Sequence, residues 1–142
     1  MRMRIPKQRL AAFRVFLARQ RYIKFAYLFG SFAKGAPGPL SDVDIAFYLR
    51  DMPKSELYRK ELFLIGKACE IMGTNHIDVV ILNDAPLLLV FNVTREGILL
   101  KGDPNQKALY EARIMDEYFD RLHFDEVYFR EFEKRLAKRG LS

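Results

Sequence analysis

Apolar and polar residues alternate in short blocks along the chain, and the spacing inside each block predicts a strand or a helix. Three apolar blocks rich in strand-forming residues occupy residues 23–29, 42–49 and 77–82. A shorter block at residues 97–101 is typical of an edge strand. These four blocks predict a small sheet.

Elsewhere apolar residues recur at three- and four-residue intervals, as on the buried side of an amphipathic helix. Helices are predicted over residues 6–21, 55–73, 87–93 and 104–139. Pro6 suits a first helical turn, Ser55 is a plausible cap, and Gly73 suits a helix end. In the last helix the spacing becomes irregular near His123, so a bend or a break is expected there.

The order of these elements predicts an α/β (α+β) fold in which helices flank a small mixed sheet. A chain of 142 residues suffices for one domain with a real core. We expect this domain to span residues 1–142, with its core at about residues 22–102 and a C-terminal helical extension at about residues 103–142.

The predicted C-terminal helix carries an apolar and aromatic stripe. Its members are Tyr110, Ile114, Tyr118, Leu122, Tyr128, Phe129, Phe132 and Leu136. The stripe could pack against the rest of the domain, or part of it could contact a second copy of the chain or a helical partner protein. The sequence leaves both interpretations open.

Two aspartates, separated by a single residue, stand at the start of the second predicted strand. Side chains two residues apart in a strand point to the same face, so Asp42 and Asp44 project together while Val43 faces the other way. Two carboxylates on one face repel each other unless a cation lies between them. Because Mg²⁺ usually binds through one or two carboxylates and the phosphates of a substrate, the pair predicts half of a metal site.

A glycine-serine turn follows the first predicted strand, where Gly30 and Ser31 open the turn and Lys34 continues it. Glycine allows a close approach, and the amides of such a turn attract phosphate oxygens, with the Ser31 hydroxyl as a further donor. Residues 36–40 contain two prolines and a glycine, so they predict a loop that brings Asp42 beside the first strand. The phosphate-binding turn and the carboxylates are therefore expected to be neighbours.

Residues 30–44 read G-S-x-A-x-G, a short loop, and then S-D-x-D before apolar residues. This combination resembles the signature of the DNA polymerase β-type nucleotidyltransferase superfamily. The resemblance implies a polymerase β palm-like fold that uses a nucleoside triphosphate and two Mg²⁺ ions. It also implies that the nucleotide is bound by Gly30, Ser31, Lys34 and Ser41.

The superfamily pattern calls for a third carboxylate on a later strand, and Asp78 stands at the start of the third predicted strand. A lone aspartate in an apolar run is costly to bury without a partner, although it could also cap the strand in solvent. By resemblance, Asp42, Asp44 and Asp78 ligate the metal ions, and Asp78 acts as base toward the attacking hydroxyl. His76 could face the same site or have a structural role.

Two later segments indicate a smaller group within this superfamily. Residues 78–89 read D-V-V-I-L-N-D-A-P-L-L-L, and residues 95–103 read R-E-G-I-L-L-K-G-D. Together with the small size of the chain, they resemble the MntA-like antitoxins of HEPN/MNT toxin–antitoxin systems. This resemblance implies a protein adenylyltransferase that moves AMP from ATP to a tyrosine hydroxyl of a HEPN ribonuclease toxin. The alternatives are a binding-only antitoxin with a vestigial site, and nucleotidyl transfer to a small molecule or an RNA end.

Charge is unevenly distributed along the chain. The net charge is +6, and the first 41 residues contain nine Lys or Arg residues and no acidic residue. This basic segment could attract a nucleotide, an RNA or an acidic protein surface, or it could be a solvated helix face. The sequence has no run of 18 apolar residues and no signal-peptide core, so we expect a cytoplasmic protein without membrane contacts.

Overall fold

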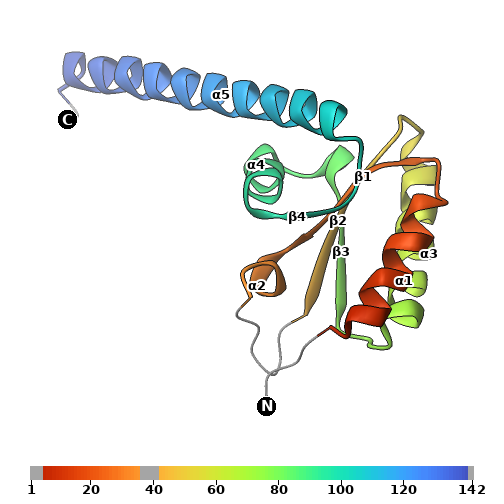
Figure 1. The fold of residues 1–142 in the computed structure, drawn as a ribbon. Coiled ribbons are helices and arrows are strands. Elements are labelled where there is room, and N and C mark those ends of the chain that lie inside the picture. The colour runs from red at the N-terminus through yellow and green to blue at the C-terminus, as the bar shows by residue number, and fades with distance from the viewer. Residues whose placement is uncertain (1–4, 36–41, 141–142) are drawn as a thin grey trace.

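The four apolar blocks form one mixed sheet, whose strands lie in the order β3-β2-β1-β4. The strands are β1 (Ile23–Phe29), β2 (Val43–Leu49), β3 (Ile77–Ile81) and β4 (Ile98–Lys101). β1 pairs antiparallel with both β2 and β4, and β3 runs parallel to β2. This arrangement comes from a computed structural model that describes residues 5–35 and 42–140, and it confirms the predicted fold class (Figure 1).

Helices cover both faces of this sheet (Figure 1). They are α1 (Lys7–Ala18), the single turn α2 (Gly30–Ala33), α3 (Lys54–Met72), the 3₁₀ turn η1 (Leu82–Asp84), α4 (Leu87–Glu96) and α5 (Pro104–Lys138). Within the described residues, no helix combines the length and the apolar character that crossing a membrane requires.

The two faces of the sheet bury different sets of side chains, because successive residues of a strand point to opposite sides. On β2, Val43, Ile45 and Phe47 belong to the core cluster that α1 and α3 cover. Ala46 and Tyr48 belong to the second cluster, with residues of α4 and α5. Asp44 lies between Val43 and Ile45 in the strand, so it points to the α4 side of the sheet.

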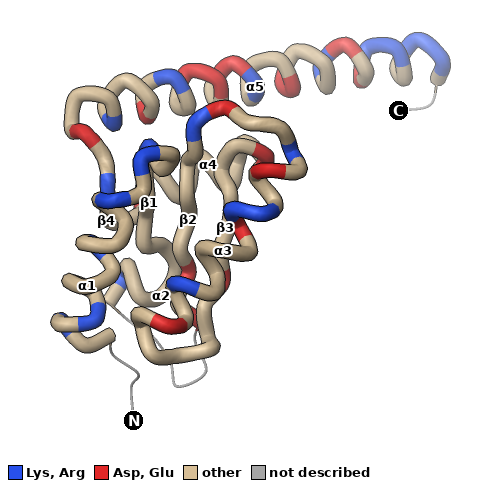
Figure 2. Tube along the Cα trace, turned by 90° about the vertical axis from the view of Figure 1, so that its right-hand side faces the viewer, with Lys and Arg blue, Asp and Glu red and all other residues tan. Residues whose placement is uncertain are grey.

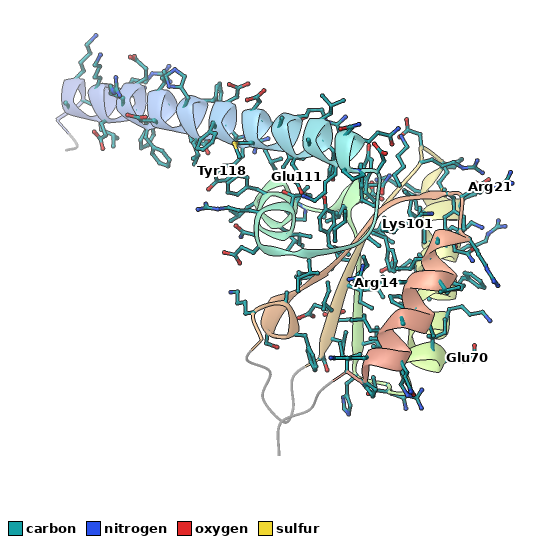
Figure 3. The ribbon with its side chains drawn as sticks, viewed as in Figure 1. Arg14, Arg21, Glu70, Lys101, Glu111 and Tyr118 are labelled. Carbon is teal, nitrogen blue, oxygen red and sulfur yellow. The ribbon has the colours of Figure 1, made fainter. Side chains whose placement is uncertain are left out.

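Helix α5 is continuous through His123, so the expected break is wrong. Residues 105–139 contain no proline or glycine, and ion pairs one turn apart, such as Arg130 with Glu126 at 2.9 Å, support the exposed helix. The first half packs on the domain, where Tyr110 and Ile114 are buried. Figure 3 shows Glu111 and Tyr118 extending from α5 toward the domain, and the Tyr118 ring stacks on Phe91 with centroids 4.0 Å apart.

Several predicted ends are also wrong. Helix α1 ends at Ala18 and not at residue 21. Helix α3 has Pro53 at its N-cap position, so Ser55 lies within the helix and is not its cap. The third strand ends at Ile81, because the chain then turns into η1. In η1 the Asn83 side chain accepts from the Leu49 amide at 2.9 Å and donates to the Leu49 carbonyl at 2.7 Å. This amide thus takes the place of a strand neighbour at the end of β2.

Candidate active site

Two of the three predicted carboxylates lie side by side on neighbouring strands. Asp44 and Asp78 are Cα partners in the parallel pairing of β2 with β3. Ile77 and Val79 belong to the cluster covered by α1 and α3, so Asp78 points to the α4 side of the sheet, as Asp44 does. Asp42 comes directly before the first residue of β2. The fold therefore brings Asp42, Asp44 and Asp78 to one end of one sheet face.

The glycine-serine turn lies at the same end. Phe29 is the Cα partner of Asp44 in the antiparallel pairing of β1 with β2, and α2 begins at the next residue. Gly30 has a φ of +72°, and a Cβ at this position would overlap the Asp44 Oδ2 atom. Only glycine lets the backbone of the turn approach the carboxylate this closely.

The carboxylates raise the electrostatic energy of the site. The pKa of Asp44 is raised above its ordinary value, chiefly because burial removes water from the carboxylate and also because Asp78 and Asp42 repel its charge. A cation or a ligand that brings one would relieve this repulsion.

His76 contributes a further polar side chain to this end of the sheet. Its Nδ1 atom lies 3.7 Å from Asp42 Oδ1, and both side chains are more than half exposed. Its backbone carbonyl accepts a hydrogen bond of 2.7 Å from the Val43 amide, which ties the start of β2 to the segment before β3. The sequence indicated this residue only by its position two residues before Asp78.

The remaining predicted nucleotide contacts differ in what the structure shows. Lys34 follows α2, and its Nζ lies 3.6 Å from the Glu96 carboxylate at the end of α4. Both side chains are exposed, so the pair leaves the lysine accessible. Ser41 lies outside the described residues.

Part of the basic N-terminal segment has a structural role. The Arg9 guanidinium donates to the Ile71 carbonyl at the end of α3, and the Arg14 guanidinium donates to the Leu99 carbonyl in β4, each at 3.2 Å. These two arginines satisfy backbone acceptors of the fold, and Figure 2 shows the basic positions of α1 along the chain trace.

The family described as "Polymerase beta, Nucleotidyltransferase" matches residues 13–106, a segment that contains the turn and all three carboxylates. The chain belongs to this family. The predicted superfamily and the assignment as a nucleotidyltransferase are confirmed at this level. No curated protein matches the sequence of this nucleotidyltransferase significantly.

Solved structures of toxin–antitoxin complexes share the fold. A toxin–antitoxin structure with AMP-PNP has a TM-score of 0.70 and 20% identity, over 90% of this chain and 99% of that chain. A structure of a tri-AMPylated HEPN toxin in complex with MNT antitoxin, from Shewanella oneidensis, has a TM-score of 0.63 and 18% identity, over 89% of this chain and 96% of that chain. A mutant MntA toxin–antitoxin structure has a TM-score of 0.69 and 18% identity, over 88% and 98%. The resemblance to MntA-like antitoxins is thereby confirmed at the level of the fold.

The carboxylates of this nucleotidyltransferase fit the chemistry of Mg²⁺. In residues 5–35 and 42–140, no three His, Cys, Asp or Glu side chains are grouped closely enough to hold a metal ion by themselves. Mg²⁺ does not need such a cage, because it keeps several waters and usually binds one or two carboxylates with substrate phosphates. The paired positions of Asp44 and Asp78 beside Gly30 provide carboxylate oxygens next to a turn that a phosphate can approach.

Proposed function

We propose that this nucleotidyltransferase moves AMP from ATP to a hydroxyl group and releases pyrophosphate. The observation that carries the proposal is the pairing of Asp44 with Asp78 beside Gly30, within a chain of this family. The site has carboxylates on one side and a glycine turn on the other, as a reaction at a nucleoside triphosphate requires.

The residues have separate roles in this proposal. Gly30 and Ser31 bind the triphosphate through backbone amides and the Ser31 hydroxyl, and Lys34 and Ser41 add contacts to its phosphates. Asp42, Asp44 and Asp78 would hold two Mg²⁺ ions. When bound, these ions neutralise charge on the triphosphate and on the entering and leaving oxygens.

The reaction balances without any further reactant. The acceptor oxygen forms a bond to the α-phosphorus of ATP, and the bond from this phosphorus to the oxygen that bridges it to the β-phosphorus breaks. The acceptor proton passes to the Asp78 carboxylate, and the electron pair of the broken bond leaves with pyrophosphate. Asp78 is suited to this role because it projects from the edge strand of the sheet, where an acceptor has access.

We propose that the acceptor is a tyrosine hydroxyl of a HEPN-family ribonuclease toxin, and that the chain acts as the cytoplasmic antitoxin. Support comes from the shared fold with toxin–antitoxin structures, one with AMP-PNP and another with a tri-AMPylated HEPN toxin. AMP adds a negative charge and bulk to the tyrosine, so it would block RNA binding at a nearby ribonuclease site by repulsion and volume.

The test is to incubate the chain with α-labelled ATP, Mg²⁺ and the HEPN-family toxin encoded beside it. We expect label on the toxin with the wild-type chain and a loss of at least about 10- to 100-fold with Asp42→Asn or Asp44→Asn, since outer partners of metal ligands already cost this much. Asp116→Asn, on the exposed outer side of α5, is the matched control and should label normally.

Two results would refute the proposal. One is a toxin that gains no label when it is incubated with the folded wild-type chain, ATP and Mg²⁺. The other is equal labelling of the toxin by Asp42→Asn, Asp44→Asn and Asp116→Asn. Neutralisation of the toxin that survives loss of both Asp42 and Asp44 would instead identify a binding-only antitoxin.

A further inference from the structure

The second half of α5 exposes an unusual number of large apolar side chains. We call residues 119–138 the arm, which runs clear of the domain after Phe119, whose ring still lies edge-on to Phe91 (Figure 1). Its exposed apolar residues are Phe119, Leu122, Phe124, Val127, Tyr128, Phe129 and Phe132. Phe129 is 62% exposed and Phe132 is 45% exposed. A surface of this kind on a helix marks a site of contact with another macromolecule.

The apolar side of the arm continues the side of α5 that packs on the domain. Ile114 and Tyr118 lie on the packed side, and Leu122 and Phe129 follow Tyr118 at four and eleven residues, which are close to whole numbers of helical turns. Phe132 and Leu136 extend the same stripe. The stripe therefore stays on the same side of α5 along the arm. A molecule that covers it must lie on the side of α5 that faces α4.

That side of the molecule also carries the proposed catalytic groups. Asp44 and Asp78 point to the sheet face that α4 and α5 cover, and β3 is an edge strand of the sheet. In Figure 2 the arm extends beyond the β3 edge of the sheet. A protein bound along the arm would thus lie on the β3 side of the molecule, and a part of it that follows this edge to the start of β3 would reach Asp78.

A second copy of this chain is a poor occupant of the stripe. In a parallel pair, the first half of the second helix would meet the domain, which already covers Tyr110 and Ile114. In an antiparallel pair, each flank of the stripe would meet the same flank of the second copy, so like charges would meet on both flanks. Glu126 and Glu133 lie on one flank of the stripe, and Arg121 and Arg135 lie on the other. A foreign helix with basic residues along one flank and acidic residues along the other avoids this conflict.

We propose that the arm is the docking site for the protein acceptor, which lays the apolar side of a helix along Leu122, Phe129 and Phe132. This inference rests on the proposed function, because it takes the acceptor to be the helical toxin. The arm gives affinity and orientation, and the carboxylates at the other end of the same sheet face perform the transfer.

The test compares Phe132→Asp with Val127→Asp, which places the same charge on the opposite side of the arm. Val127 is 42% exposed and lies two residues before Phe129, so it points away from the stripe. Binding of the intact chain to the HEPN-family toxin encoded beside it is measured by titration calorimetry without ATP. We expect Phe132→Asp to weaken binding at least about tenfold and Val127→Asp to leave it within about twofold.

Both variants should keep the melting temperature and the ATP affinity of the wild type, since neither residue belongs to either core cluster. With α-labelled ATP, Phe132→Asp should raise the KM for the toxin and leave kcat unchanged. Wild-type affinity in Phe132→Asp, equal weakening by both variants, or a wild-type chain that does not bind the toxin would each overturn the docking site. So would a wild-type dimer that Phe132→Asp dissociates. A toxin that binds through the arm and gains no label would support the docking site and refute the proposed transfer.

Discussion

Asp44 is the residue at which stability and proposed function oppose each other. Its pKa is raised by burial and by the neighbouring carboxylates, so the folded chain holds its proton more tightly than the unfolded chain does. The contribution of Asp44 to stability is therefore fully present below its ordinary pKa of 3.8 and is lost as the pH rises through the raised value.

We predict that Asp44→Asn raises the melting temperature of the free protein at neutral pH. The gain should shrink as the pH falls and disappear below pH 3.8, where the wild-type carboxylate becomes protonated in both states. Thermal unfolding followed across this pH range checks the prediction, with Asp116→Asn as a control that should show no such trend. A neutral-pH melting temperature below that of the wild type would contradict it.

Gly30 allows a second test at the level of single residues. Gly30→Ala introduces a Cβ where the Asp44 carboxylate lies, at a φ of +72° that alanine tolerates poorly. Gly35 has the same φ but no atom within 4 Å of an added Cβ. Each alanine should cost about 1–2 kcal/mol for the backbone, and Gly30→Ala should cost more because of the overlap.

The two alanine variants should also differ in activity. We expect Gly30→Ala to abolish most AMP transfer and Gly35→Ala to retain it once both proteins are assayed well below their melting temperatures. Chemical denaturation and the labelling assay measure the two effects. Equal losses of stability and activity in both variants would mean that the close approach to Asp44 is unimportant.

At the level of elements, α5 has one half that stabilises the domain and one that does not. Tyr118 stacks on Phe91, whereas Tyr128 is 58% exposed and ten residues further along the same helix. We predict that Tyr118→Ala lowers the free energy of unfolding by about 1–3 kcal/mol, as expected for loss of a packed aromatic ring. Tyr128→Ala should change it by less than about 0.5 kcal/mol.

Chemical denaturation of both variants measures this difference. The two substitutions remove the same side chain from the same helix, so helix propensity cancels in the comparison. Similar losses in both would show that the arm folds back onto the domain.

The strands could be predicted from the sequence because their apolar blocks are short and bounded by turns. Their faces could also be predicted, since alternation alone places Asp42 and Asp44 opposite Val43. The ends were harder, because they depend on partners far along the chain. Leu49 ends β2 beside the Asn83 side chain, and no local pattern announces this contact. The contact of Lys34 with Glu96 is hidden for the same reason.

Which part of the C-terminal stripe is buried could not be predicted, because apolar residues recur on one side of the helix both before and after Tyr118. Burial distinguishes the halves, and burial depends on where the domain ends in space. The first half of the stripe packs on the domain, as one of the two interpretations requires, and contact of the exposed second half with another molecule stays a prediction.

Considered as a whole molecule, the chain divides its work between the two faces of the sheet. One face is sealed by α1 and α3 over a core of aliphatic and aromatic residues. The other face carries Asp44 and Asp78 at one end and α5 at the other. A ligand that binds this second face of the folded chain should therefore stabilise the fold.

The last prediction uses this linkage between ligand binding and global stability. A ligand that binds only the folded chain stabilises it by about 2.7 kcal/mol at one hundred times its dissociation constant, which is roughly 10 °C in melting temperature for a domain of this size. We predict such a rise with α,β-methylene-ATP and Mg²⁺ together, and a much smaller one when EDTA replaces Mg²⁺.

Because the cation offsets the repulsion that raises the pKa of Asp44, Asp44→Asn should begin from a higher melting temperature and gain little from Mg²⁺. Asp116→Asn should show the full rise. A Mg²⁺-dependent rise of equal size in Asp44→Asn would show that Mg²⁺ binds elsewhere in the molecule and not at this carboxylate.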